Sequence, residues 1–221
     1  MIARILPAAV AAVESFGDPD TPVVLFPQEE AALGYSVAKR RNEFTTARWC
    51  ARAALARLGL PAVPIVPGER GAPVWPDGVV GSITHCDGYR ACALAHEGEV
   101  RTLGVDAEPN AALPAGVLDA VAAHAERNHL RRLAKDGPGV SWDRLLFSAK
   151  ESVYKAWFPL TRRFLDFAEA DVRPAVDGTF TARLLVDPPL VDGRALTGFD
   201  GRWIASDGLL LTSIVIERPI R

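Results

Sequence analysis

The order of helical and strand-like patterns restricts the folds open to this chain. After residues 1–28, rich in Pro, Ala and Asp, a helical stripe covers 36–58 and short alternating segments follow it. Pro109, Asn110 and Pro114 then interrupt the chain, and a second helical region is again followed by strands. This order predicts an α+β fold of two similar halves with pseudo-twofold symmetry. Each half would be a helix packed on a small antiparallel sheet, with the active site in the cleft between them.

The Pro-rich break sets the expected boundary between an N-terminal half, 1–108, and a C-terminal half, 109–221. In the first half we expect one long helix, capped by Ser36 and ended by Gly59. The strands expected there are Val23–Phe26, Val63–Val66, Val79–His85, Tyr89–Ala95 and Val100–Glu108. The second half should hold helices over Leu118–Lys135, open to a break, and Ser141–Phe158, then strands Asp171–Pro174, Phe180–Val186, Arg202–Ser206 and Leu209–Ile216.

Composition narrows the class of protein. The chain has 221 residues, 49% of them hydrophobic, with a net charge of −2, which fits a globular protein and argues against a dedicated nucleic-acid binder. No apolar run is long enough to span a membrane. The three cysteines show no metal-ligand spacing, and their odd number suits a reducing compartment. We therefore expect buried free thiols in a cytoplasmic protein.

Two short segments bring acidic and basic groups onto regular elements. Residues 104–108, Gly-Val-Asp-Ala-Glu, end an alternation of period two, so Asp106 and Glu108 should project from one face of a strand. In the second segment Glu151 and Lys155 are four residues apart in a helical pattern, which stacks them on one face. Two strand carboxylates facing a helix carboxylate form a plausible oxygen site for Mg²⁺.

The surroundings of Glu151 decide between a surface ion pair and a functional site. By default Glu151 would be solvated and paired with Lys155, an interaction worth only about 0.3–0.5 kcal/mol. However, aromatic side chains flank it at Phe147, Tyr154 and Phe158. A helix covered on both sides makes a carboxylate costly unless a cation compensates it. This cost favours a functional site at Glu151 over a surface ion pair.

Three carboxylates alone would repel a phosphate ligand, so cations have to balance them. The candidates are Lys155, Lys150, His85 and the basic face of the first long helix. Two of these also have ordinary explanations: a lone histidine beside a turn is more often structural, and a basic helix face is commonly just solvated.

Three motifs in order carry a family resemblance. They are GSITHC (81–86), GVDAE (104–108) and FSAKESVYKAW (147–157), and together they resemble the 4′-phosphopantetheinyl transferases of the Sfp/EntD type. The segments KRRNEF (39–44), WPDG (75–78) and YKAWFPLT (154–161) are similar to the actinobacterial branch of that family. The resemblance covers residues 37–165.

The resemblance implies roles for individual residues. Asp106, Glu108 and Glu151 would be Mg²⁺ ligands, and Lys155 would stabilise the transferring or leaving phosphate. The implied coenzyme A contacts are Arg40 and Arg48 at the 3′-phosphate end, Lys150 and His85 at the phosphates, and Asp106 and Lys155 at the reacting end. The branch commonly has a lysine where Pro67 stands here, and Arg70 is expected to take over that contact.

The implied reaction moves the phosphopantetheine arm of coenzyme A to a serine of an apo acyl or peptidyl carrier protein and releases adenosine 3′,5′-bisphosphate. Glu151 is the leading candidate for the base that takes the serine proton, directly or through water. The implied partners are coenzyme A and carrier proteins of fatty-acid, polyketide or nonribosomal peptide synthesis, with no nucleic acid and no membrane, and the protein is expected to be a monomer. Two alternatives stay open: a Mg²⁺-dependent phosphodiesterase or nucleotide hydrolase, and a non-catalytic module that binds coenzyme A or carrier protein.

Overall fold

The computed structural model describes residues 1–219 and consists of two compact units. The first unit comprises Met1–Leu103 together with residues 216–219, and the second comprises Gly104–Val215. The sequence places the boundary at residue 108, whereas these units part after Leu103. From Gly104 onwards the strand lies directly against a helix of the second unit, so Asp106 and Glu108 belong with that unit.

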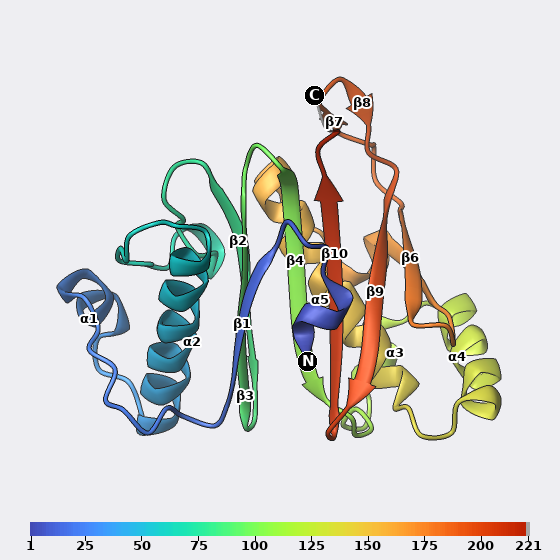
Figure 1. Cartoon of the computed structure of the whole chain (residues 1–221). Helices are drawn as coiled ribbons and strands as arrows, with labels where there is room; N and C mark the ends of the chain where they lie inside the picture. Colours follow the sequence, from blue (N-terminus) through green and yellow to red (C-terminus); the bar gives the residue numbers. More distant parts are fainter. Residues whose placement is uncertain (220–221) are drawn as a thin grey trace. The chain divides into compact units, whose positions relative to one another are not determined.

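The first unit is a three-stranded antiparallel sheet, in the order β1-β3-β2, packed against one long helix (Figure 1). Its elements are η1 (Ile2–Ile5), β1 (Ala11–Phe16), α1 (Pro27–Leu33), α2 (Ala38–Arg57), η2 (Glu69–Gly71), β2 (Val79–Cys86) and β3 (Tyr89–His96). The predicted hairpin of Val79–His85 and Tyr89–Ala95 is confirmed, with His85 paired opposite Arg90.

Helix α2 packs closely on this sheet because the side chains on its buried face are small. Its fully buried residues are Cys50, Ala51, Ala54 and Leu55, and they belong to one core cluster with Val13, Ile65, Cys92 and Leu94. The helix ends before Gly59, whose positive φ of 73° is the conformation expected at this position. The predicted cap is wrong: Ser36 donates to the Leu33 carbonyl, and Val37 is the N-cap residue.

In the first unit two predicted strands are wrong, and one strand is missing from the prediction. Residues 23–26 and 63–66 join no sheet, and side chains bond several of their backbone groups. Glu29 accepts hydrogen bonds from the amides of Phe26 and Ile65, each at 2.9 Å. The Arg52 guanidinium donates to the Val24 carbonyl at 2.7 Å. The missed strand is β1, whose Ala-rich start gives a weak β signal.

The second unit contains a five-stranded sheet in the order β4-β10-β9-β6-β5 and a small hairpin, β7-β8. Its elements are β4 (Val100–Pro109, from Gly104 onwards), α3 (Val117–Val121), α4 (His124–Asp136), α5 (Trp142–Thr161), η3 (Phe167–Glu169), β5 (Ala170–Pro174), β6 (Thr179–Leu184), β7 (Leu190–Val191), β8 (Arg194–Ala195), β9 (Gly198–Ser206) and β10 (Leu209–Glu217). In Figure 1 helix α5 runs behind this sheet. The α+β class is confirmed, and so is the break in the first helix of this half.

Helix α5 buries one side along its whole length. Leu145, Leu146, Ala149 and Trp157 have no exposed surface, in agreement with the predicted apolar stripe. Its predicted N-cap, Ser141, lies at the N-cap position, but its side chain makes no capping bond. Within residues 1–219, no helix combines the length and the apolar character that crossing a membrane requires.

Strand β4 and helix α5 come closest at Gly104. A Cβ atom built there would lie 2.2 Å from the Ser152 carbonyl oxygen and 2.7 Å from the Ala156 nitrogen. Both are backbone atoms of the helix, so they cannot move aside without moving α5 itself. Glycine at this position therefore sets the spacing between the strand that carries Asp106 and the helix that carries Lys155.

We expect Gly104→Ala to lower the free energy of unfolding by about 1–3 kcal/mol, because the added methyl group forces strand and helix apart. Urea denaturation measures this change. Gly139→Ala is the matched control, since a Cβ at Gly139 meets no atom within 4 Å and its φ is not in the left-handed region. Equal loss of stability in the two variants would contradict the importance of the close approach.

The cysteines are free, and two of the three are in the core. Cys50 and Cys92 have no exposed surface, whereas Cys86 at the end of β2 is half-buried. Burial raises the pKa of the Cys50 thiol to about 12 and that of Cys92 well above its ordinary value. Such thiols are inert near neutral pH. The prediction of buried free thiols is thus correct for Cys50 and Cys92.

Candidate active site

The structure brings Asp106 and Lys155 into direct contact. The Lys155 ammonium donates to Asp106 Oδ1 at 2.7 Å and to the Val105 carbonyl at 3.1 Å. The Asp106 side chain is 7% exposed, and that of Lys155 is 26% exposed. One end of this ion pair is therefore buried, while the lysine still reaches the surface. The contact joins β4 to α5, as the two sequence motifs predict.

Glu151 belongs to the same electrostatic group. The side chain is half-buried on α5, one turn before Lys155. Burial raises the pKa of Glu151, and the charges of Asp106 and Glu108 raise it further, whereas Lys155 acts in the opposite direction. All three predicted carboxylates therefore lie close enough to affect one another's ionisation.

Glu108 has a partner that the sequence analysis did not identify. Arg144, in the first turn of α5, donates from Nη1 to Glu108 Oε2 at 2.8 Å. Burial and the nearby Asp106 raise the pKa of Glu108, and the Arg144 hydrogen bond opposes them. Three carboxylates thus face two cations, Lys155 and Arg144, and the group keeps an excess of negative charge.

This donor set is suited to a hard divalent cation, although it is not preassembled around one. Within residues 1–219, no three His, Cys, Asp or Glu side chains already stand in a metal-binding arrangement. Asp106 and Glu108 instead point at Lys155 and Arg144. The ligand atoms are all carboxylate oxygens, which Mg²⁺ prefers, and their mutual repulsion is what a divalent cation would relieve.

Lys150 is placed differently from its predicted role in coenzyme A binding. Its side chain is 2% exposed and forms an ion pair at 3.0 Å with Glu126, which is 0% exposed. The ammonium also donates to the Phe167 carbonyl at 2.7 Å. Glu126 in turn accepts from the Val172 amide at 2.8 Å. Lys150 therefore ties α5 to α4, η3 and the start of β5 inside the unit, which corrects the expectation of a phosphate contact.

The predicted basic residues of α2 have contrasting environments. Arg40 is exposed near the start of the helix. Arg48 is 7% exposed, donates from Nε to the Ile65 carbonyl at 3.0 Å, and stacks on the Phe44 ring at 3.5 Å from its centroid. Burial, helped by the positive charges of Arg52 and Arg40 and opposed by the Glu29 carboxylate, lowers the pKa of Arg48 to about 10. A cation held in this way can attract an anion only through the part of its guanidinium that the fold leaves accessible.

His85 and Arg70 lie elsewhere in the first unit. His85, at the end of β2, has a half-exposed side chain with Nδ1 3.8 Å from Glu43 Oε2. Arg70 is exposed and has a positive φ of 53°. It stands in the turn between Pro67 and Pro73, which form an isolated β-bridge.

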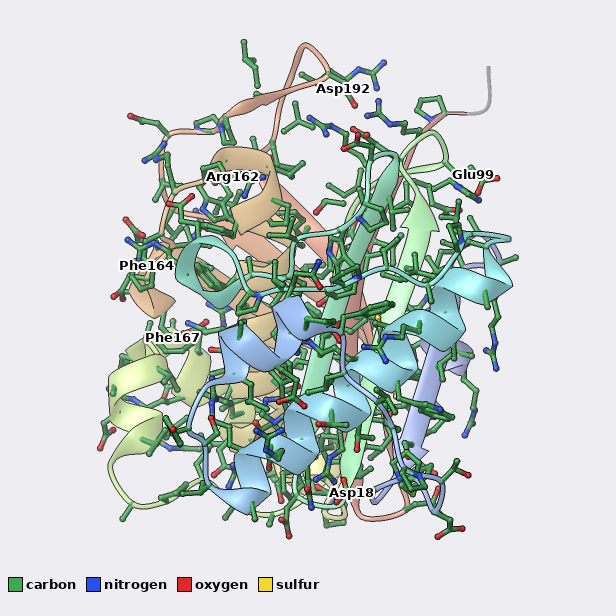
Figure 2. All side chains as sticks on the ribbon, turned by 90° about the vertical axis from the view of Figure 1, so that its left-hand side faces the viewer. Asp18, Glu99, Arg162, Phe164, Phe167 and Asp192 are labelled. Atoms are coloured by element: carbon green, nitrogen blue, oxygen red, sulfur yellow. The ribbon has the colours of Figure 1, made fainter. Side chains whose placement is uncertain are left out.

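Aromatic side chains accompany the charged group along α5. The Tyr154 ring packs on Phe158 and on Phe164, with centroids 5.9 and 5.7 Å apart. Phe164 is 55% exposed. Figure 2 shows Arg162, Phe164 and Phe167 following one another down one side of the second unit. The predicted aromatic cover of the second face of α5 is thus present, and part of it faces solvent.

Arg144 and Glu126 are the functional neighbours that the sequence analysis missed. Arg144 had a usable signal, since it precedes Glu151 by seven residues, and two helical turns bring it back to nearly the same face. Glu126 had none, because its partner Lys150 is 24 residues away and only the packing of α4 on α5 brings them together.

Comparison with known proteins now assigns the chain to a family. Residues 28–95 match the model of the 4′-phosphopantetheinyl transferase N-terminal domain. Residues 102–204 match the model of the 4′-phosphopantetheinyl transferase superfamily. The chain belongs to the 4′-phosphopantetheinyl transferase family, and it is a transferase.

Relatives from actinobacteria cover nearly the whole chain. It is 56% identical to the 4′-phosphopantetheinyl transferase Svp of Streptomyces mobaraensis, over 99% of this chain and 90% of the relative. It is 47% identical to the 4′-phosphopantetheinyl transferase PptT of Mycobacterium tuberculosis, over 98% of each chain. Identity to the 4′-phosphopantetheinyl transferase Npt of Nocardia iowensis is 50%, over 97% of this chain and 99% of the relative. The resemblance to the actinobacterial branch is confirmed.

Proposed function

We propose that this protein transfers the 4′-phosphopantetheine arm of coenzyme A to a serine of apo acyl or peptidyl carrier proteins. The serine oxygen forms a bond to the β-phosphorus of coenzyme A, the diphosphate P–O bond breaks, and adenosine 3′,5′-bisphosphate leaves. The observation that supports this most directly is the meeting of Asp106, Glu151 and Lys155 from two elements of one unit. A transferase acting on a diphosphate needs carboxylates for a cation and an ammonium for phosphate charge.

Each residue of the group has a separate task in this proposal. Lys155, partly exposed, neutralises charge on the transferring or leaving phosphate. Asp106 holds the Lys155 ammonium in place. Glu151 takes the serine proton, directly or through water. These three residues act from fixed positions on β4 and α5, so little rearrangement of the backbone is required.

We assign the Mg²⁺ ligands to Asp106, Glu108 and Glu151. When bound, Mg²⁺ would supply positive charge to the diphosphate oxygens as the P–O bond of the diphosphate breaks. The carboxylate oxygens match its ligand preference, and the surplus negative charge of the group favours a cation there. The Glu108 carboxylate would then have to bind the cation while it also contacts Arg144.

The first unit contributes contacts to coenzyme A in this proposal. Arg40, exposed on α2, and the accessible part of Arg48 would receive the 3′-phosphate. His85 would donate to a diphosphate oxygen. Arg70 would make the phosphate contact of the lysine that Pro67 replaces in this chain. We further propose that the protein acts as a cytoplasmic monomer, with carrier proteins as its macromolecular partners and without nucleic-acid or membrane binding.

The decisive experiment is mass spectrometry of an apo carrier protein incubated with this protein, coenzyme A and Mg²⁺. We expect the carrier to gain the mass of one phosphopantetheine arm, with adenosine 3′,5′-bisphosphate released only when carrier is present. Release without carrier would favour the hydrolase alternative. Binding of coenzyme A without release in either reaction would indicate a non-catalytic module.

A further inference from the structure

Arg144 makes more contacts than an ordinary surface arginine. Besides the bond to Glu108, its Nε donates to the Ala111 carbonyl at 3.1 Å and its Nη2 to the Ala112 carbonyl at 2.9 Å. Its side chain is 17% exposed, and that of Glu108 is 18% exposed. One guanidinium therefore joins the last carboxylate of β4 to the segment that follows it. Because Arg's donors form a rigid fork, these three contacts fix its orientation.

Other bonds hold the same segment to the start of α5. Asn110 donates from Nδ2 to the Gly139 carbonyl and accepts from the Ser141 amide, each at 2.9 Å. The Asp143 carboxylate accepts from the Leu113 amide at 2.8 Å. Loss of Arg144 would thus leave several ties between β4 and α5 intact. A substitution of Arg144 can therefore remove its charge without breaking the connection between β4 and α5.

The charge has a direct consequence for the three carboxylates. Lys155 occupies Asp106, and Arg144 occupies Glu108, so each strand carboxylate already has a protein cation. A divalent cation that takes an oxygen of Glu108 must share it with Arg144 or displace the guanidinium. Like charges in a partly buried group repel more strongly than in water. Arg144 therefore opposes the binding of any cation beside Glu108.

We propose that Arg144 is a positioning residue that orients Glu108 and, as its resident counter-ion, limits the affinity of the carboxylate group for divalent cations. This inference rests on the proposed function, because it assumes that the carboxylates of that site bind the cation. A cation that the protein holds too firmly would slow the release of the bisphosphate product bound to it. Arg144 thus keeps cation binding reversible while it aligns the third carboxylate.

The test is a titration of the full chain with Mn²⁺ at saturating coenzyme A, with free Mn²⁺ followed by electron paramagnetic resonance. We expect Arg144→Gln to bind Mn²⁺ about 3- to 10-fold more tightly than the unaltered protein, because one opposing charge is lost. A purely structural role would weaken binding or leave it unchanged. Arg144→Lys should bind like the unaltered protein, since it keeps the charge while losing the fork of contacts.

Two controls make the result specific. Arg132→Gln removes an exposed arginine of α4 and should leave Mn²⁺ affinity unchanged. In the Glu108→Gln background, Arg144→Gln should no longer tighten Mn²⁺ binding, because the ion pair between Arg144 and Glu108 is already lost. Unchanged or weaker binding by Arg144→Gln, in protein whose thermal unfolding is still cooperative, would overturn the inference. The proposed function fails by a different result, namely no Mn²⁺ binding and no transfer by the unaltered protein.

Discussion

Glu151→Gln is expected to lower the rate of phosphopantetheine transfer by at least about 100-fold without loss of fold. The substitution keeps the shape of the side chain but removes its charge and its capacity to take a proton. A carboxylate that both holds a cation and accepts the serine proton is needed in the transition state, where the loss of one such group costs about 10²- to 10³-fold. Mass spectrometry of an apo carrier protein after timed incubation measures the rate.

Stability in EDTA separates a lost function from a lost fold. The pKa of Glu151 in the folded protein lies above the ordinary value of 4.5. The carboxylate therefore disfavours the folded state as the pH rises from that value through the folded pKa, and at neutral pH its charge is a net cost. Glu151→Gln should consequently unfold at a temperature equal to or higher than the unaltered protein at pH 7. Exposed Glu99, seen at the edge of Figure 2, offers the matched control Glu99→Gln, which should transfer normally. Substantial activity in Glu151→Gln would remove this residue from the essential group.

Lys150→Met is expected to lower the free energy of unfolding by about 3–5 kcal/mol, with urea denaturation as the measurement. The substitution leaves Glu126, which is 0% exposed, without its charged partner. Burial lowers the pKa of Lys150, while the Glu126 carboxylate raises it. Each buried charge therefore depends on the other for its stabilisation. Lys135→Met, at the exposed end of α4, is the control and should have little effect.

A second substitution tests the reason for this loss. Glu126→Gln removes the charge left behind, so the double variant with Lys150→Met should recover part of the lost stability. If instead Lys150→Met unfolds like the unaltered protein and raises the KM for coenzyme A, the lysine contacts phosphate as the family resemblance implied. The two roles of Lys150 therefore give opposite results in two separate measurements.

Prediction from sequence succeeds where the signal is local and repeated. The alternation over β2 and β3, with a turn at Asp87-Gly88, sufficed to predict their hairpin. The stripe of α5 likewise predicted which of its residues are buried. Prediction from sequence failed for residues 23–26 and 63–66, whose apolar composition resembles that of a strand. There the amides bond to Glu29, a residue of α1 that no periodicity connects with them.

Lys150 and Lys155 show the same division within one helix. They are five residues apart, which places them about 140° apart around α5, whereas Glu151 and Lys155 differ by only about 40°. The sequence thus shows that the two lysines face different ways. Which of them faces the carboxylates depends on where β4 and α4 pack. The close approach at Gly104 brings Asp106 to Lys155, and the packing of α4 brings Glu126 to Lys150.

The sequence by itself determined the kinds of elements, the residues able to supply oxygen and ammonium groups, and the family of transferases to which the chain belongs, because these depend on composition and spacing along one element. Tertiary structure alone decided the pairing of charges: Lys155 with Asp106, Lys150 with Glu126, and Arg144 with Glu108. Each pair joins residues at least 24 positions apart, as with Glu126 and Lys150. Electrostatic interaction depends on distance in space and on burial, and neither is set by the spacing of residues along the chain.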